Sequence, residues 1–474
     1  MTEWNIPIWQ GGMGAGVSSY NLARAVSSLG QGGIVSGTGL DVFLARRLQD
    51  GDLNGDIRRA LDNFPFQDMA SRITNNYFIS GGRKGEPYKK VPMHTLEGNR
   101  EAQELCIAGN FVEVFLAHEC HSNPVGINYL EKIQLSHLPS LYGAMLANVN
   151  FVVMGAGIPI EIPGVLDALA KNQPTSYLVH VQGVSDNKVY RTSFNPTLFQ
   201  ENNKINTLYR PDFFPIISSV ALGSILLKKS NGKISGLVIE GNLAGGHNAP
   251  PRGALKLTSD GQPIYGSRDV INIQELQDLG LPFWLAGNYG SPERFHEAIN
   301  QGANGVQIGT AFALCKESGL DDELKNQLIL KALRGEAVVF TDPVASPTGF
   351  PFKVAKLEDT LSEKEIYEKR KRICDLGFLR QVYQTEGGKI DYRCPAEPEK
   401  VFLAKGGKLQ DTIGRKCLCN ALTANIGRSQ LLSDGTLEKA LITLGDDFSG
   451  IGRFCTKDNP EYTAEHVIKT ILNQ

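Results

Sequence analysis

The chain has 474 residues, of which 41% are hydrophobic and 21% charged, and its formal net charge is −2. This balanced charge excludes a nucleic-acid binder that works by bulk positive charge. No apolar run approaches the roughly 20 residues of a membrane span, and the N-terminus has neither the basic nor the apolar region of a signal peptide. We therefore expect the eight cysteines to be reduced thiols of a cytoplasmic protein, with no nucleic-acid or membrane partner.

Short apolar runs alternate with helix-like segments through the first two-thirds of the chain. The candidate strands, in chain order, are Ile6–Gln10, Gly33–Ser36, Val125–Asn128, Phe151–Met154, Tyr177–Val181, Phe213–Ser218, Leu237–Glu240, Phe283–Ala286 and Gly305–Ile308. The helical stretches between them include Asp41–Gln49, Arg100–Ala117, Gly164–Lys171, Val220–Lys229 and Pro292–Asn300. This alternation predicts a parallel sheet covered by helices.

Nine candidate strands are one more than a (β/α)8 barrel holds. We place Tyr177–Val181 outside the barrel, because the polar segment Asp186–Asp212 after it lacks periodicity and is typical of an excursion over the surface. The composition changes near Lys316, and residues 321–335 and 358–373 are charged and helix-prone. We therefore predict a TIM barrel over 1–318, a mostly helical insert or cap over 319–417, and a C-terminal helical segment over 418–474 that packs back on the barrel.

A glycine-rich loop that carries His247 follows the predicted strand Leu237–Glu240. In parallel α/β folds the carboxyl ends of the strands are where chemistry is done. Gly245 and Gly246 precede the histidine and let the backbone pass close to a flat ligand, because they have no Cβ. The alternative is an ordinary turn with a surface histidine.

Four more strands end in glycine-rich loops, at Gln10–Ser18, Gly155–Pro159, Ala286–Glu293 and Gly309-Thr310. The first loop lacks the G-x-G-x-x-G spacing, so the sequence gives little support to a dinucleotide-binding Rossmann fold. The last two loops follow strands seven and eight, where barrels commonly hold the phosphate of a cofactor on backbone N–H groups. Together the loops predict a phosphate-bearing cofactor.

These loops resemble the superfamily of nitronate monooxygenases (2-nitropropane dioxygenases) and FMN-dependent enoyl-acyl-carrier-protein reductases. The matching pieces, in family order, are Gln10–Gly14, Pro124–Asn128, Ser218–Leu222, Ala244–His247 and Gly305–Phe312. The insert is similar to that of the trans-acting enoyl reductases of polyketide and polyunsaturated-fatty-acid synthases. That similarity rests on Asn248–Arg252, Tyr392–Pro398 and Gly414–Asn420.

The resemblance implies an FMN-binding TIM barrel and places His247 at the position of the family's active-site histidine. The residues that it implies around FMN are Gly11, Gly12, Met13, Asn128, Gly245, Gly246, Gly287, Gly290, Gln307, Gly309 and Thr310. One departure lies in the phosphate loop, which usually reads Ala-Gly-Gly-Ile. Here Asn288 and Tyr289 follow Gly287, and the second glycine recurs at Gly290, so the phosphate contacts stay open.

The resemblance further implies an FMN-dependent, NAD(P)H-consuming enoyl reductase that acts on enoyl thioesters carried by acyl carrier protein. His247 would donate a hydrogen bond to the thioester oxygen or supply the proton at Cα. The alternatives are a nitronate monooxygenase, in which His247 acts as a base, and a barrel that only binds a phosphate. The sequence leaves open the acyl chain length, the choice between NADH and NADPH, and the oligomeric state, a homodimer included.

Three other groups of residues suggest sites. Cys374, Cys394, Cys417 and Cys419 lack the usual spacing of a zinc site, so we expect no metal and interpret them as buried thiols that pack the insert against the barrel. His118–His121 lacks the H-E-x-x-H spacing and is interpreted as a helix end. The run Lys369–Arg372 suits either a solvated helix face or a contact with an acidic carrier protein.

Overall fold

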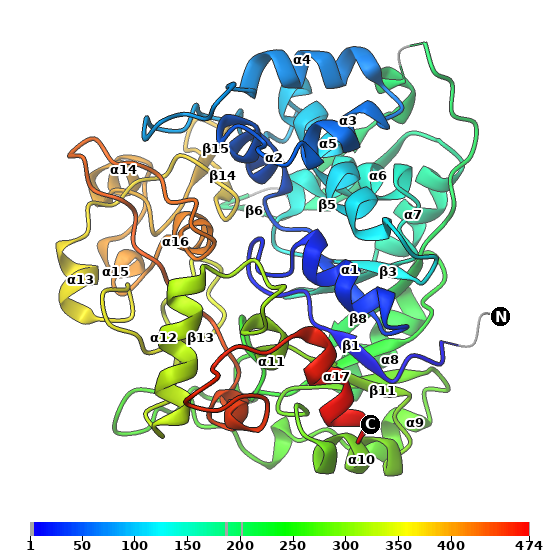
Figure 1. Cartoon of the computed structure of the whole chain (residues 1–474). Coiled ribbons are helices and arrows are strands. Elements are labelled where there is room, and N and C mark those ends of the chain that lie inside the picture. The colour runs from blue at the N-terminus through cyan, green and yellow to red at the C-terminus, as the bar shows by residue number, and fades with distance from the viewer. Residues whose placement is uncertain (1–3, 185–187, 201, 474) are drawn as a thin grey trace.

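The computed structural model describes residues 4–184, 188–200 and 202–473, and its centre is a barrel of eight parallel strands (Figure 1). In the order in which they pair, these are β1 (Ile8–Gln10), β11 (Gly305–Ile308), β10 (Phe283–Ala286), β9 (Leu237–Glu240), β8 (Asp212–Ile217), β4 (Phe151–Gly155), β3 (Val125–Leu130) and β2 (Gly33–Ser36). The barrel closes between β1 and β2, where the Gln10 N–H donates to the Gly32 carbonyl at 2.9 Å. The predicted (β/α)8 barrel is confirmed.

Large aromatic side chains fill the interior of the barrel. Trp9 and Trp284 stack with ring centroids 4.2 Å apart, and the ring of Phe214 meets both edge-on. Phe151, on the far side, lies 4.7 Å from the ring of Trp9. Because these rings leave no channel, ligand space is confined to the ends of the strands, as in other barrels of this kind.

Helices cover the outside of the barrel. They are α1 (Tyr20–Ser28), α2 (Leu40–Gln49), α3 (Asp56–Asp62), α4 (Gln67–Tyr77), α5 (Arg100–His118), α6 (His137–Leu146), α7 (Ile162–Ala170), α8 (Val220–Lys229), α9 (Ile273–Gln277), α10 (Pro292–Asn300) and α11 (Thr310–Ala313). Local sequence explains their starts. Ser219 and Ser291 accept hydrogen bonds from backbone N–H groups of the first turns of α8 and α10, and Pro292 occupies the first position of α10.

The strand β5 (Thr175–Val179) lies outside the barrel, as predicted, and pairs antiparallel with β7 (Tyr190–Phe194). The excursion predicted over Asp186–Asp212 lies partly outside the described residues. Its described part does not simply cross the surface, because Phe194 and Phe199 are buried and Phe194 contacts Tyr142 of α6. Between β5 and β7 in the chain lies β6 (Val181–Gln182), which pairs with a strand of the insert.

The insert holds helices and strands and lies on one side of the barrel (Figure 1). Its elements are α12 (Asp322–Leu333), β12 (Val339–Asp342), β13 (Phe352–Ala355), α13 (Lys364–Lys369), β14 (Gln381–Gln384), β15 (Ile390–Arg393), α14 (Glu399–Ala404) and α15 (Leu409–Thr412). Of the charged stretch 358–373, only α13 is helical. One reason is that the next side chain, Arg370, pairs with the buried Glu438 at 2.5 Å, which draws the chain inward.

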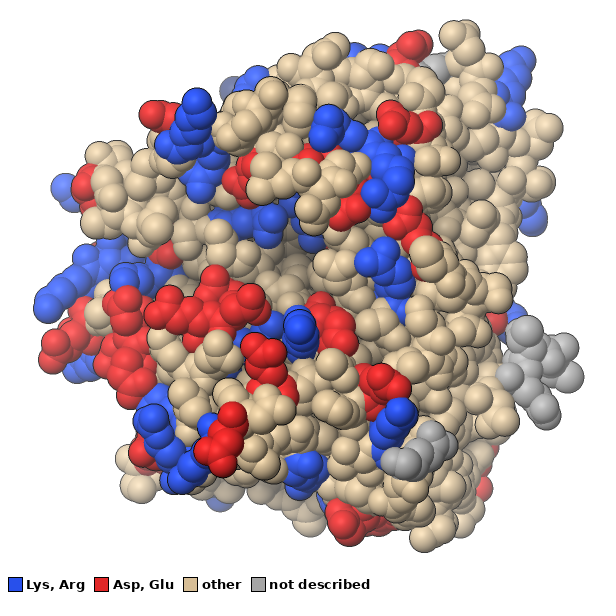
Figure 2. Space-filling view, viewed as in Figure 1, with Lys and Arg blue, Asp and Glu red and all other residues tan. Residues whose placement is uncertain are grey.

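The chain then returns to the barrel through α16 (Leu418–Ala424), a 3-10 turn over Asp446–Arg453, and α17 (Ala464–Leu472), which lies beside α10 and α11 in Figure 1. Basic and acidic side chains are interspersed on the face shown in Figure 2, which is hollowed near its centre. Among the described helices, none combines the length and the apolar character needed to span a membrane.

Candidate functional site

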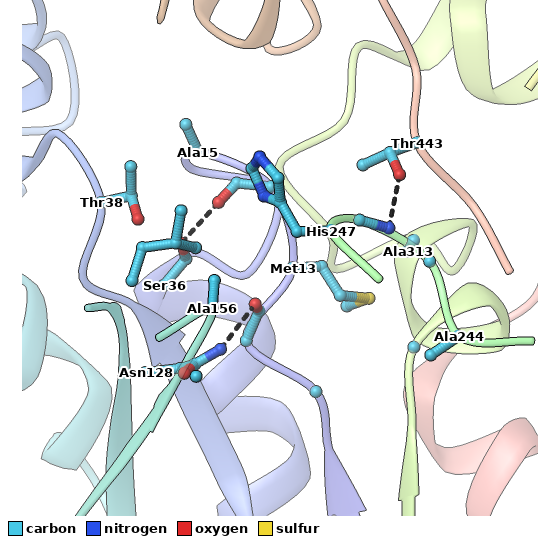
Figure 3. A pocket seen from close by; sticks show the side chains of 18 of the residues that line it. Met13, Ala15, Ser36, Thr38, Asn128, Ala156, Ala244, His247, Ala313 and Thr443 are labelled. Atoms are coloured by element: carbon cyan, nitrogen blue, oxygen red, sulfur yellow. Dashed lines mark hydrogen bonds between the residues drawn. The ribbon is translucent and has the colours of Figure 1, made fainter. Parts of the chain in front are cut away.

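A cavity of about 180 Å³ lies at the carboxyl ends of the barrel strands (Figure 3). The sequence-predicted residues that line it are Gly11, Gly12, Met13, Asn128, Gly245, Gly246, His247, Gly287, Gln307, Gly309 and Thr310. Gly290 is not among the lining residues. It lies behind the wall, where its carbonyl accepts a hydrogen bond from Arg453 Nη1 at 2.5 Å. The fold thus brings together residues at the ends of all eight barrel strands with segments of the insert and of the C-terminal region.

The floor of the cavity has the features of a site for a flat, polar ring. A Cβ on Gly12 would lie 2.3 Å from Cβ of Asn128, so only glycine permits this approach of the two loops. Asn128 Nδ2 donates to the Gly12 carbonyl at 3.1 Å (Figure 3). Asn128 Oδ1 and Gln307 Oε1 are buried and have no hydrogen-bond partner among the described residues. A ring with N–H donors, such as a flavin, would satisfy them, so these residues fit the predicted cofactor.

The insert holds the histidine loop in place. Lys353 N–H donates to the Gly246 carbonyl and Asn248 N–H to the Pro351 carbonyl, both at 2.9 Å. These bonds add a short strand-like bridge between His247 and Phe352, whose rings lie 4.9 Å apart. His247 is therefore fixed from the insert side while it faces the cavity near Met13 (Figure 3).

Burial keeps the His247 imidazole neutral over a wider pH range than usual. Desolvation lowers its pKa to about 4, so the imidazole is neutral at pH 7. Its Nε2 lies 2.7 Å from Ser346 Oγ, which in turn lies 2.8 Å from Thr348 Oγ1. A neutral imidazole that engages a hydroxyl through Nε2 keeps its second ring nitrogen for a ligand.

The loop that carries Ser346 is itself anchored by the predicted motif Gly414–Asn420. Arg415 Nη1 donates to the carbonyls of Val344 and Ser346, at 2.8 and 2.5 Å. Lys416 adds a backbone bond to the Ala345 carbonyl at 2.9 Å and an ion pair with Asp342 at 3.0 Å. The motif therefore acts on the histidine through Ser346, which sequence reasoning missed.

The two glycines before the histidine have distinct reasons to be glycine. Gly246 has φ +81°, and a Cβ on Gly245 would lie 2.9 Å from the backbone of Leu444. Gly246 N–H donates to Thr443 Oγ1 at 2.7 Å (Figure 3). Thr443 and Leu444 of the C-terminal region thus form part of the cavity wall.

Sequence reasoning also missed Glu240, the last residue of β9, whose side chain lines the cavity. Desolvation raises its pKa to about 8, so the carboxyl is mostly protonated at neutral pH. A protonated carboxyl is a hydrogen-bond donor and a proton source. The signal that could have found it is an acidic residue at a strand end, seven positions before the histidine.

At the end of the cavity predicted for a phosphate, Gly287, Gly309 and Thr310 line the wall. Asn288 has φ +65°, a conformation that asparagine tolerates, which explains how it replaces the family's second glycine. A carboxyl that was not predicted, that of Asp447, shares this end and hydrogen-bonds to the Thr310 side chain. Burial raises the pKa of Asp447 and favours its neutral form.

The predicted cysteine group does converge. Cys394 and Cys417 are buried in one cluster, which Cys374 and Cys419 contact. Among the described residues, no group of three or more histidine, cysteine or acidic side chains is arranged to hold a metal ion. Cys419 also lines the cavity. The packing role of these thiols stays a prediction.

The other two groups have structural partners. His118 is the last residue of α5, and its Nε2 lies 3.0 Å from Asn150 Oδ1. The run Lys369–Arg372 is not a solvated helix face, because α13 ends at Lys369. Arg370 is buried against Glu438, and Arg372 pairs with Glu399 at 3.3 Å. A contact of this run with a carrier protein would therefore rest on Lys369 and Lys371.

Comparisons with known proteins agree with the site. The nitronate monooxygenase family model matches residues 119–348. A probable nitronate monooxygenase from Bacillus subtilis (strain 168) is 36% identical over 93 residues. That alignment spans 20% of this chain and only a quarter (25%) of the relative's length.

Three solved structures have similar overall arrangements. FabK from Thermotoga maritima has 16% identity and a TM-score of 0.46, over 99% of this chain and 92% of that one. The nitroalkane oxidase from Streptomyces ansochromogenes has 13% identity and a TM-score of 0.48, over 99% and 95%. The enoyl reductase domain of MlnA from Bacillus amyloliquefaciens has 10% identity and a TM-score of 0.44, over 98% and 92%. These TM-scores lie below 0.5, so the likeness does not extend to a functional assignment.

The family match runs from the end of α5 through the histidine loop and β11 into the insert, and it therefore includes the segments that build most of the cavity. Over residues 119–348, just under half of its length, the chain is similar to the nitronate monooxygenase family.

Proposed function

We propose that the chain is an FMN-dependent enoyl reductase that uses NAD(P)H and acts on enoyl thioesters carried by acyl carrier protein. The observation that carries this proposal is the pair of neutral donors, His247 and Glu240, on one cavity. Reduction of an enoyl thioester places negative charge on its oxygen and requires a proton at Cα. Both needs are met by hydrogen-bond and proton donors.

FMN would be held by Asn128 and Gln307 at its ring and by Gly287, Gly309 and Thr310 at its phosphate. When bound, it supplies the two-electron redox chemistry. The resemblance of the insert to that of trans-acting enoyl reductases supports the thioester as substrate.

We assign the two donors different roles. His247 donates its single N–H, on Nδ1, to the thioester oxygen, while its Nε2 accepts a hydrogen bond from the Ser346 hydroxyl, which fixes the ring. Glu240, whose pKa is about 8, delivers the proton to Cα and regains one from water. A histidine with a pKa near 4 is a poor proton source at neutral pH, which is why the carboxyl takes that role.

The alternative is a nitronate monooxygenase, which the matching family model favours. In that reaction His247 would accept a proton from a carbon atom. A pKa near 4 makes the imidazole a weak base, and this observation favours the reductase.

Two assays separate the two functions, an anaerobic one for enoyl reduction and one in air-saturated buffer for oxygen uptake. The purified yellow protein is given NADPH and a crotonyl thioester, and NADPH oxidation is followed. The reductase predicts oxidation that depends on the thioester and falls sharply in His247→Ala, with flavin retained. Oxygen uptake that depends on a nitronate and not on NADPH, together with no thioester-dependent oxidation, would establish the monooxygenase. Full enoyl reduction by His247→Ala would remove His247 from the mechanism.

A further inference from the structure

A second cavity, of about 250 Å³, adjoins the first. Ile133, Phe378 and Leu379 line both, so the two spaces share a wall. The second cavity is lined by the basic side chains Lys132 and Arg380, and by two histidines, His94 and His180. No aspartate or glutamate is among its described lining residues. In a chain of net charge −2, the two fixed positive charges of Lys132 and Arg380, with no carboxylate in the described lining, indicate a place for an anion.

Hydrogen bonds and a contact with an aromatic ring fix the position of the Arg380 guanidinium. Its Nη2 donates to the His94 carbonyl at 2.9 Å and its Nε to the Gly377 carbonyl at 3.1 Å. The guanidinium also lies over the ring of Tyr392, 4.7 Å from the centroid. Its Nη1 makes no hydrogen bond within the described part of the chain. A guanidinium fixed on one edge and free on the other loses little entropy when it binds an oxyanion.

The sheet of the insert brings His180 to the same place. In the parallel pair β6–β14, Val181 is opposite Val382, which sets His180 beside Gln381, the residue after Arg380. The backbone N–H of His180 donates to Gln134 Oε1 at 2.9 Å, and its ring has no partner among the described residues.

Lys132 completes the group from the barrel side. It follows β3, its side chain is 39% exposed, and its nearest carboxylate oxygen, of Glu131, is 3.9 Å from Nζ. That distance, to Oε2, is at the outer limit of an ion pair, and the other oxygen of Glu131, Oε1, accepts hydrogen bonds from Gln134 and the hydroxyl of Tyr177, at 2.7 and 3.1 Å. The ammonium group is therefore only weakly paired and can turn to an anion.

We infer that this second cavity binds the phosphate ester of a substrate whose reactive end enters the flavin cavity. This inference rests on the proposed function. Arginine with lysine is the combination that recognises phosphate oxygens. Thr348, which lines the second cavity, hydrogen-bonds to Ser346, which in turn hydrogen-bonds to His247 of the first cavity, so the two spaces are close enough for one extended molecule to occupy both. The phosphate is that of a phosphopantetheine arm or that of NADPH.

The test compares matched substrates with and without the phosphate. Crotonyl-phosphopantetheine is compared with crotonyl-pantetheine, and NADPH with NADH, in wild type, Lys132→Met and Arg380→Gln. For one of the two pairs, we expect the wild-type preference in kcat/KM for the phosphorylated partner to fall about tenfold in each variant. Lys228→Met, which changes an exposed lysine on α8, should keep the wild-type preference.

The outcomes are distinct. A fall confined to the thioester pair identifies the phosphopantetheine arm, and a fall confined to the nucleotide pair identifies NADPH. Unchanged preferences in both pairs, or a fall equal to that of Lys228→Met, overturn the inference. Lys132→Met changes a part-exposed side chain, so it keeps the test valid if Arg380→Gln fails to fold. Calorimetric binding of phosphopantetheine against pantetheine needs no turnover, so it tests the cavity even if the protein reduces no thioester.

Discussion

Nε2 of His247 and Oγ of Ser346 lie 2.7 Å apart, although 99 residues separate them in the chain. The histidine belongs to a barrel loop and the serine to the insert. The hydroxyl decides which ring nitrogen faces the cavity and, together with the ring of Phe352, limits the ring's rotation. The insert therefore forms part of the candidate site and is not only a cover over it.

Ser346→Ala should reduce turnover without removing flavin. Loss of the hydroxyl frees the His247 ring to rotate, so we expect kcat to fall about tenfold to a hundredfold. The measurement is thioester-dependent NADPH oxidation, with flavin absorbance as the check on cofactor content. Thr360→Ala provides a comparison, because it removes a buried hydroxyl of the insert that does not line the cavity. Equal losses in the two variants would show that the effect is general destabilisation.

The pH dependence of the reaction rate should reflect the ionisation of Glu240. Its pKa is raised, so the carboxyl is protonated below about pH 8 and loses its proton as the pH rises through that value. The proposed reaction needs the protonated form, so the rate should decline above about pH 8. The His247 pKa of about 4 places any change of the imidazole far on the acid side.

Glu240→Gln should remove the decline in rate above about pH 8, because the amide does not titrate, and should lower the rate on the plateau below that pH.

The raised pKa of Glu240 also predicts how the stability of the fold depends on pH. The folded carboxyl holds its proton between about pH 4.5 and pH 8 while the unfolded one does not, so it destabilises the fold as the pH rises through that window. Glu240→Gln should therefore raise Tm at pH 8. If the decline in rate above about pH 8 persists in Glu240→Gln, that decline arises from another group.

The barrel was predictable because its signals are local. The runs Leu237–Glu240, Phe283–Ala286 and Gly305–Ile308 agree with β9, β10 and β11 to the residue, since a glycine or a proline lies at or next to each end of these runs. Glycine-rich loops at the strand ends likewise pointed to the cavity. Local sequence, apolar runs together with the glycines that follow them, was enough for both.

The partners of His247 were not predictable from the sequence, because they belong to segments that come close to the histidine only in the folded chain. Ser346 reaches the histidine only because Arg415 and Lys416 hold its loop. Asp447 reaches Thr310 through a turn near the C-terminus. Neither contact leaves a trace in composition or spacing. Glu240 was accessible to sequence reasoning, but the rise in its pKa depends on burial by other segments.

Gly12→Ala tests the close approach of the first and third barrel loops. The new Cβ would lie 2.3 Å from Cβ of Asn128, so one loop must move. We expect a loss of about 1–3 kcal/mol in the free energy of unfolding and a clear loss of bound flavin. The measurements are thermal unfolding and the flavin-to-protein absorbance ratio.

Gly241→Ala is the matched control for that experiment. It lies at the end of β9, and its nearest atom to a new Cβ is the Ala286 carbonyl oxygen at 3.8 Å, an ordinary contact. It should keep both Tm and flavin. Full flavin in Gly12→Ala would mean that the first loop does not contact the ring.

Asp447→Asn should strengthen FMN binding, because the carboxyl shares the end of the cavity predicted for the phosphate. Burial raises the Asp447 pKa, so the group is neutral at low pH and becomes negative as the pH rises through that value. The phosphate of FMN itself titrates at about pH 6, in both proteins alike, so the affinity of the wild type should fall with rising pH relative to that of the variant. If binding of the phosphate shifts the Asp447 pKa by one unit, the reciprocal effect on FMN affinity is about tenfold.

The measurement is the dissociation constant of FMN from the apoprotein, determined by fluorescence quenching between pH 5 and pH 9. The same pH slope in both proteins would place the phosphate away from Asp447.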